Sequence, residues 1–186
     1  MGFSLGWLAT RHIDPRDLYE PLHARPTGIK GPALSSAAMA GPIPSGWHLF
    51  LMNRQERLVA DALLADISKP GDAVGCFIEE HVMYSAAVQW RQGAKVWSIV
   101  HDSDKGIMHL DVAGDVPEAL SVARARCDAA QRLDHAGDPE VDHMFDIPVD
   151  VAQAVTGFRH DAPDMGVDLE VLEVASRGWW RRLLGR

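Results

Sequence analysis

Residues 74–113 read VGCFIEEHVMYSAAVQWRQGAKVWSIVHDSDKGIMHLDVA and contain two predicted antiparallel hairpins. A two-residue turn at Gln92–Gly93 closes the first hairpin, and a loop over 103–106 closes the second. The first turn places Val88 opposite Trp97, and in this register the apolar side chains share one face of the sheet. The reverse face is expected to hold Ser85, Gln89, Ser98, Asp102, His109 and Asp111. Such a division is typical of an antiparallel sheet that is covered on one side.

The remainder of the chain adds helices and strands around this meander. Apolar periodicity and the placement of proline, glycine and capping residues predict helices over 15–23, 53–68, 117–133 and 148–156. Further strands are predicted over 3–9, 47–52 and 168–174. Residues 28–46 are predicted to form a long loop, and the strand at 168–174 is predicted to lie at a sheet edge because its polar positions carry charge.

These elements predict an α+β fold, in which an antiparallel β-meander sheet is packed on one face by several helices. A chain of 186 residues can bury a core of its own, and one domain is the default at this length. We expect a single α+β domain over residues 1–176, followed by a short basic tail over 177–186 that is rich in Trp, Arg and Leu.

Composition excludes several classes of protein. The formal net charge is −8 with histidine counted as neutral, which excludes nucleic-acid binding by bulk positive charge. No apolar run approaches the ~20 residues of a transmembrane helix, and the first residues lack the basic region and cleavage site of a secretory signal. Cys76 and Cys127 are too far apart for a C-x-x-C site and are expected to be buried free thiols. We therefore expect a cytoplasmic protein with no transmembrane segment and no nucleic-acid partner.

Nine histidines, several of them beside acidic residues, raise the question of a metal or acid-base site. His109 and Asp111 lie two residues apart on one predicted strand face, with Ser98 opposite Asp111. Arg159-His160-Asp161 follows a short predicted helix and places a guanidinium, an imidazole and a carboxylate in one loop. Both sets also have a structural interpretation, because a solvated sheet face and a helix end collect such residues.

The candidate catalytic residues are therefore His109, Asp111, Arg159, His160 and Asp161. None of them belongs to a recognised metal or phosphate-binding motif, so we expect no metal and no cofactor. In the predicted register, His101 and His109 lie on opposite faces of the sheet and cannot share a metal ion.

Three stretches of the chain form a recognisable pattern. They read EEHVMYS at 79–85, VWSIVHD at 96–102 and GFRHD at 157–161. This pattern resembles one found in a family of small bacterial proteins that carry no assigned activity. The resemblance implies a bacterial protein and supplies no reaction, so no catalytic role is transferred from it.

Charge is distributed unevenly along the chain. Residues 134–173 hold eleven acidic side chains and a single basic residue, Arg159, whereas residues 176–186 hold four arginines and no acid. An acidic surface of this density accelerates association with a cationic partner. We therefore expect a non-catalytic interaction protein of the immunity or antitoxin type, which binds a basic toxin or nuclease domain. The expected partner-binding residues are Asp138, Glu140, Asp142, Asp146, Asp150 and Asp164.

Two alternatives stay open at this point. The protein could instead be a small metal- or ligand-binding enzyme that uses the histidine and aspartate clusters, and a homodimer is compatible with either function.

The WWRRLL run at 179–184 could act as an interfacial anchor, as a helix that docks on a partner, or as a terminal helix that packs its tryptophans on the domain. We favour the last of these three interpretations.

Overall fold

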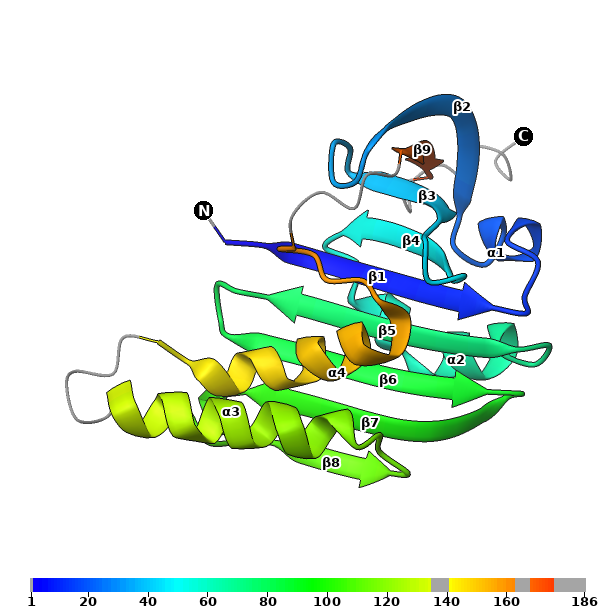
Figure 1. Ribbon diagram of the computed structural model, residues 1–186. Helices are drawn as coiled ribbons and strands as arrows, with labels where there is room; N and C mark the ends of the chain where they lie inside the picture. Colours follow the sequence, from blue (N-terminus) through cyan, green and yellow to red (C-terminus); the bar gives the residue numbers. More distant parts are fainter. Residues whose placement is uncertain (1, 135–140, 163–167, 176–186) are drawn as a thin grey trace, which may run out of the picture.

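The computed structural model describes residues 2–134, 141–162 and 168–175. Within those ranges, nine strands form one antiparallel sheet in the order β2-β9-β3-β4-β1-β5-β6-β7-β8 (Figure 1). The strands are β1 (Ser4–Arg11), β2 (Ala24–Pro32), β3 (Ala38–Pro42), β4 (His48–Asn53), β5 (Asp72–Glu79), β6 (Tyr84–Arg91), β7 (Ala94–Asp102), β8 (Asp111–Gly114) and β9 (Asp168–Val174). The helices are α1 (Arg16–Tyr19), α2 (Asp61–Ile67), α3 (Ala119–Asp134) and α4 (Asp146–Thr156), with short 3-10 turns η1 (Glu56–Val59), η2 (Ser103–Lys105) and η3 (His143–Phe145). The expected α+β fold built on an antiparallel sheet is confirmed.

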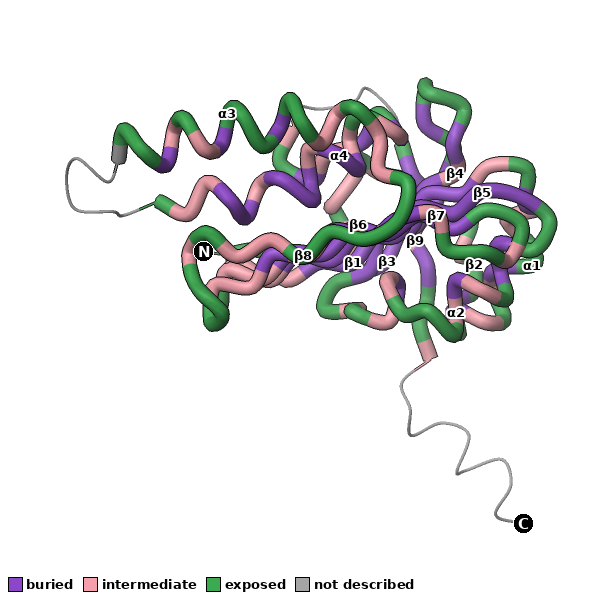
Figure 2. The backbone as a smooth tube through the Cα atoms, turned by 90° about the horizontal axis from the view of Figure 1, so that it is seen from below, coloured by how far each residue is buried: buried purple, intermediate pink, exposed green. Residues whose placement is uncertain are grey.

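Elements pack on both faces of the sheet (Figure 2). On one face α4 packs directly against β5, β6 and β7, and α3 packs on α4 and η3. The shorter α1, η1 and α2 contribute buried side chains to a second cluster on the other face. Side chains alternate between the two clusters along β1, where Trp7 faces the α4 side and Leu8 the α2 side. Several helices were expected on one face. α3 and α4 cover one face, whereas α1, η1 and α2, which fall within the helices predicted over 15–23 and 53–68, lie on the other.

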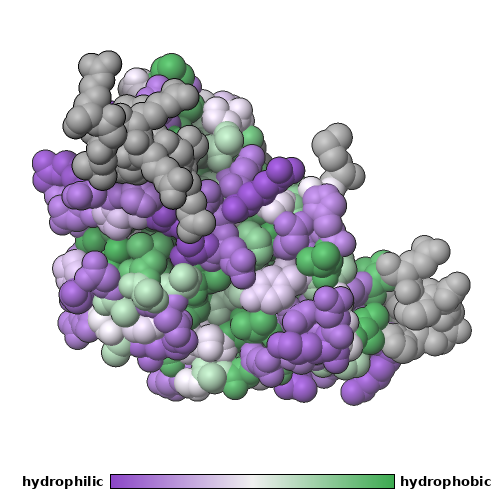
Figure 3. All heavy atoms as spheres, turned by 180° about the vertical axis from the view of Figure 1, so that it is seen from behind, coloured by the Kyte–Doolittle hydropathy of each residue, from purple (hydrophilic) through white to green (hydrophobic). Residues whose placement is uncertain are grey.

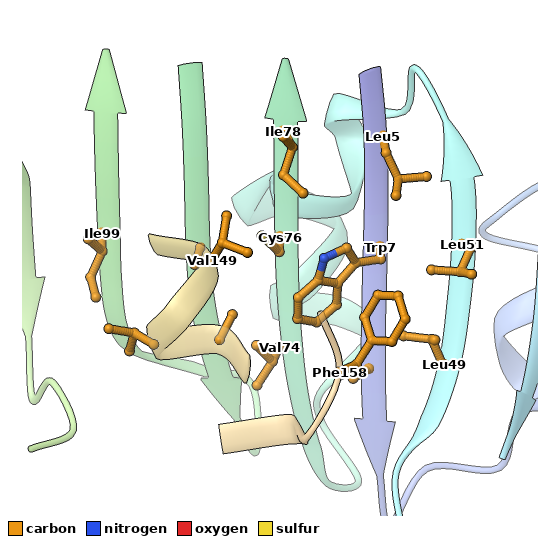
Figure 4. Close-up of a cluster of buried hydrophobic side chains, with 14 of the residues drawn as sticks. Leu5, Trp7, Leu49, Leu51, Val74, Cys76, Ile78, Ile99, Val149 and Phe158 are labelled. Carbon is orange, nitrogen blue, oxygen red and sulfur yellow. The ribbon is translucent and has the colours of Figure 1, made fainter. Parts of the chain in front are cut away.

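The larger core lies between α4 and the sheet. Trp7 is fully buried, and its ring meets the edge of the Phe158 ring at a centroid distance of 5.3 Å and an interplanar angle of 85° (Figure 4). Gly157, at φ +80°, ends α4 in the left-handed conformation that lets the chain turn toward β1. Phe158 therefore anchors the start of the loop that carries Arg159 and His160. Cys76 and Cys127 are buried free thiols, as expected.

On the second face, the backbone around η1 lies directly on two glycines of the sheet. A Cβ atom at Gly75 would lie 2.2 Å from the backbone oxygen of Leu58, and one at Gly6 would lie 2.2 Å from the backbone oxygen of Gln55. Any other residue at these positions of β5 and β1 would push η1 away from the sheet. The two glycines therefore set the distance between the sheet and its second layer.

The first hairpin departs from its predicted register by one residue. The turn at Gln92–Gly93 forms as predicted, with both residues at positive φ. A β-bulge next to the turn then shifts the pairing, so that Gln89 rather than Val88 lies opposite Trp97. A shift of one residue moves side chains to the opposite face, and the predicted division of the two faces is wrong for β6.

Two polar residues that were expected on a solvated face are consequently buried on the α4 side. The Ser85 hydroxyl donates a hydrogen bond of 2.7 Å to the backbone oxygen of Phe145. The Gln89 side-chain oxygen accepts one of 2.7 Å from the indole N–H of Trp97. Both polar groups are satisfied, and this allows them to lie in the core.

The predicted loop at 28–46 contains strand β3 and part of β2, and the predicted edge strand is internal. β9 pairs with both β2 and β3, so the edges of the sheet are β2 and β8. The charges on β9 that indicated an edge face basic residues across the ladder, with Glu170 opposite Lys30 and Glu173 opposite Arg25. None of the helices in the described ranges is long and apolar enough to cross a bilayer. The tail over 177–186 lies outside those ranges.

Candidate functional site

Three carboxylates surround the guanidinium of Arg159. Its Nη2 donates to Asp146 Oδ1 at 2.8 Å and its Nε donates to Asp161 Oδ1 at 2.6 Å, while Nη1 donates to Asp150. Arg126, on α3, donates a further hydrogen bond to Asp150. The Arg159 side chain is only 16% exposed. The cluster therefore ties α3, α4 and the loop after α4 together.

The pKa values of Arg159 and Asp161 favour their charged forms, whereas that of Asp150 does not. Burial opposes the charge of Arg159, but its hydrogen bonds to Asp161 and Asp146 outweigh burial and raise the pKa of the guanidinium. Burial also acts against the Asp161 carboxylate, yet the hydrogen bond from Arg159 keeps the pKa of Asp161 below its ordinary value. Burial raises the pKa of Asp150 despite the two arginines beside it. Four of the five N–H groups of Arg159 donate to carboxylates within the described ranges, so most of its donor capacity is used inside the fold.

A polar hollow of about 390 Å³ opens between α3 and α4 beside the cluster. Arg126, Asp150 and Arg159 contribute to its wall, together with Cys127 and His143. Burial raises the pKa of the Cys127 thiol, against the influence of the neighbouring Arg126. The thiol is therefore poorly suited to act as a nucleophile at neutral pH.

His160 packs elsewhere, although it follows Arg159 directly. Its ring meets the ring of Phe3 edge-on at 5.0 Å, and its side chain is 2% exposed. Nε2 lies 3.7 Å from Glu80 Oε1 and Nδ1 lies 3.9 Å from Asp161 Oδ1, and neither ring nitrogen has a hydrogen-bond partner within the described part of the chain. Burial lowers the pKa of His160, so the ring is neutral at neutral pH.

A buried histidine that was not among the candidate catalytic residues joins β7 to η3. His101 is fully buried, with Nε2 2.8 Å from Asp142 Oδ2 and Nδ1 2.8 Å from the backbone oxygen of His109. Both partners are acceptors, so both ring nitrogens carry hydrogen when both bonds form. Burial opposes this charge, but the hydrogen bond to Asp142 outweighs burial and raises the pKa of His101.

Asp142 has a second structural role at the same point. Its Oδ1 accepts hydrogen bonds from the backbone N–H groups of Met144 and Phe145 and so caps η3. The sequence separation of 41 residues between His101 and Asp142 explains why no local pattern indicated the pair. The one local sign in the sequence is Asp142 itself, because an aspartate just before a helical turn is a common cap.

His109 and Asp111 form the contact that their spacing predicted, with His109 Nε2 3.0 Å from Asp111 Oδ2. Ser98 is not opposite Asp111, because β8 pairs Asp111 with Val100. The Nδ1 atom of His109 accepts a hydrogen bond of 3.1 Å from the backbone N–H of Asp102. The lone pair that a general base would use is thus occupied in this arrangement.

The rings of His101 and His109 lie 6.4 Å apart, which corrects the expectation that opposite sheet faces separate them. His109 lies in the loop before β8, which begins only at Asp111. Even so, no group of three or more His, Cys, Asp or Glu side chains among the described residues is arranged to hold a metal ion.

The expected partner-binding residues divide into two groups of three. Asp142, Asp146 and Asp150 have the internal hydrogen bonds described above, with His101, Arg159 and Arg126 as partners. The other three, Asp138, Glu140 and Asp164, lie outside the described residues.

Comparison of the chain with protein-family models, with curated proteins and with solved structures found no match.

Proposed function

We propose that the protein is a non-catalytic interaction protein of the cytoplasm, which binds a basic protein partner through the acidic segment 134–173. The observation that carries this proposal is the position of Arg159, the only cation of the segment. Asp146, Asp150 and Asp161 surround it, so its charge is balanced by these three carboxylates rather than by the segment's other acidic side chains. Those acidic residues attract a cationic partner over long range.

The candidate catalytic groups support a structural role rather than a chemical one. The Nδ1 lone pair of His109 is occupied, and the nitrogens of Arg159 all donate to carboxylates. Burial raises the pKa of the Cys76 thiol as it does that of Cys127. These groups make internal contacts or are buried, which fits a binding protein of the immunity or antitoxin type. Its partner would be a basic toxin or nuclease domain.

Within the segment, we assign the partner contacts to Asp138, Glu140 and Asp164. Asp142, Asp146 and Asp150 are assigned to the internal hydrogen bonds of the fold, because each is hydrogen bonded to a histidine or an arginine of this chain. This division separates the residues whose substitution should affect binding from those whose substitution should affect stability.

Affinity capture from a lysate of the producing cells, with the full chain as bait, tests the proposal. A basic partner should be retained, and its association rate constant should fall steeply as salt rises, because surface charges are screened. Asp138→Asn/Glu140→Gln should slow association several-fold. Asp115→Asn/Glu118→Gln, at two exposed positions before α3 and outside the acidic segment, is the matched control with the same change in charge. Association that is insensitive to salt, or slowed equally by both pairs, would contradict the proposal.

One observation favours the alternative of a small metal- or ligand-binding enzyme. His160 is buried beside Glu80 and Asp161 with no hydrogen-bond partner for either ring nitrogen in the described ranges. Elemental analysis and zinc titration of the purified protein test this alternative. It predicts a bound metal that is lost in His160→Ala, whereas the interaction function predicts the same metal content in both proteins.

A further inference from the structure

A hollow on the second face of the sheet, between α1 and α2, has no part in the proposed function. Its volume is about 520 Å³. The apolar wall includes Ile13, Leu18 and Ile67, each less than a tenth exposed. The face seen from behind shows apolar patches bordered by hydrophilic side chains (Figure 3).

Acidic side chains predominate among the charged residues of this hollow. Asp17 and Glu20 contribute from α1 and the turn after it, and Asp66 contributes from α2. The single basic residue of the lining, Lys69, lies 2.6 Å from Asp66 and forms an ion pair with it. The hollow therefore combines apolar walls with net negative charge, and it suits a ligand that is both apolar and cationic.

The described chain ends beside this hollow. The backbone N–H of Ala175, just past β9, donates a hydrogen bond of 2.9 Å to the backbone oxygen of His23. His23 follows Pro21, a lining residue of the hollow, by two positions. Trp179 follows Ala175 by four residues, and an extended chain covers ~3.3–3.6 Å per residue, or about 13 Å in all. The segment after Ala175 can thus reach the hollow.

The segment itself has the complementary chemistry. Trp179 and Leu183 are spaced four residues apart, as are Trp180 and Leu184, which is the spacing that brings side chains together on one side of a helix. Arginines stand between these apolar residues, at 181 and 182. A tryptophan buries a large apolar surface when it fills such a hollow.

We propose that residues 177–186 dock in the hollow between α1 and α2 of their own chain. Trp179 and Trp180 pack on its apolar walls, and Arg181 and Arg182 pair with Asp17 and Glu20. The segment thereby covers part of the second face of the sheet, where α1, η1 and α2 are shorter than α3 and α4 are on the first. This inference is independent of the partner proposed for the acidic segment.

Acrylamide quenching of tryptophan fluorescence in the full chain tests this docking. The four other tryptophans, Trp7, Trp47, Trp90 and Trp97, are each less than a tenth exposed, so quenching reports mainly on Trp179 and Trp180. Docking predicts weak quenching in the unaltered chain. Asp17→Lys/Glu20→Lys should raise the quenching constant several-fold, and adding Arg181→Glu/Arg182→Glu to that variant should restore protection.

The matched control is Asp115→Lys/Glu118→Lys, which makes the same change in charge at two exposed positions before α3 and should leave quenching unchanged. Strong quenching in the unaltered chain, or no response to the reversal at 17 and 20, would overturn the proposal. Protection that disappears on dilution would overturn it in favour of a second copy of the chain as the source of the segment. Protection that arises only with phosphatidylglycerol vesicles would overturn it in favour of a membrane anchor.

Discussion

Arg159 is the residue on which the ionic cluster beside α4 depends. Arg159→Met leaves Arg126, whose side chain is 61% exposed, as the arginine paired with Asp150 in the described part of the chain, and Asp150 is 10% exposed. Removing one member of a buried ion pair leaves the other charge buried without a partner, and we expect a loss of about 3 kcal/mol in the free energy of unfolding. Urea denaturation measures this loss.

Arg126→Met is the control, because it removes a contact to the same Asp150. The Arg126 side chain is 61% exposed, so we expect a loss below about 1 kcal/mol. Equal losses in the two variants would show that Arg159 stabilises the fold no more than Arg126 does.

His101 and His160 should give opposite pH dependences of stability. The pKa of His101 is raised from 6.5, so its contribution is complete below pH 6.5 and is lost as pH rises through the raised pKa. The pKa of His160 is lowered by burial, so its contribution is complete above pH 6.5 and is lost as pH falls through the lowered pKa. Denaturation of the unaltered chain and of His160→Phe across a pH series separates the two. His160→Phe should lose less stability below pH 6.5, and identical slopes in that range would rule out the assigned role of His160.

Sequence reasoning identified the side-chain contacts between residues that are close together in the chain. His109 and Asp111 are two residues apart, and Arg159 and Asp161 likewise, so their spacing alone indicated that they could meet. The pair of His101 and Asp142 depends on how β7 and η3 pack, and no spacing pattern encodes that contact.

In the hairpin of β6 and β7, the sequence likewise predicted the local turn but not the tertiary contact that sets the register. Gln92–Gly93 is a local turn signal, and the turn formed as predicted. The bulge beyond it places Gln89 and Trp97 in a buried hydrogen bond, which is a tertiary contact. The strand at 168–174 was assigned to an edge because its polar positions carry charge. No local pattern showed that β2, about 140 residues earlier in the chain, would pair with it and place basic residues opposite those charges. Strand propensity was readable from the sequence, and strand order was not.

The close approach of η1 to β5 predicts that a side chain at position 75 destabilises the fold. Gly75→Ala places a Cβ atom against the backbone of Leu58, which cannot rotate away, and we expect a loss of about 2 kcal/mol in the free energy of unfolding. Gly31→Ala on β2 is the control, because its Cβ would meet the Ser35 hydroxyl at 2.9 Å, and that side chain can rotate. Thermal or urea denaturation measures both. A Gly75→Ala protein as stable as Gly31→Ala would mean that η1 is not fixed on the sheet.

For the whole molecule, the acidic segment combines two uses of charge. Asp142, Asp146, Asp150 and Asp161 hold η3, α3, α4 and the loop after α4 together through hydrogen bonds to a histidine and two arginines. The sequence showed the excess of acid but not this internal use, because Arg126 and His101 lie outside the segment. The proposed binding function therefore rests on Asp138, Glu140 and Asp164, which lie outside the described residues.

The most direct test compares Asp146→Asn/Asp150→Asn with Asp138→Asn/Glu140→Gln in two measurements, the free energy of unfolding and the association rate constant with the captured basic partner. Both pairs change the net charge by the same amount, so a difference between them reports where the charges act. The first pair should lower stability and slow association little, and the second pair should slow association several-fold without loss of stability. The opposite pattern, or a chain that retains no basic partner at low salt, would contradict the division of the acidic segment into internal and binding residues.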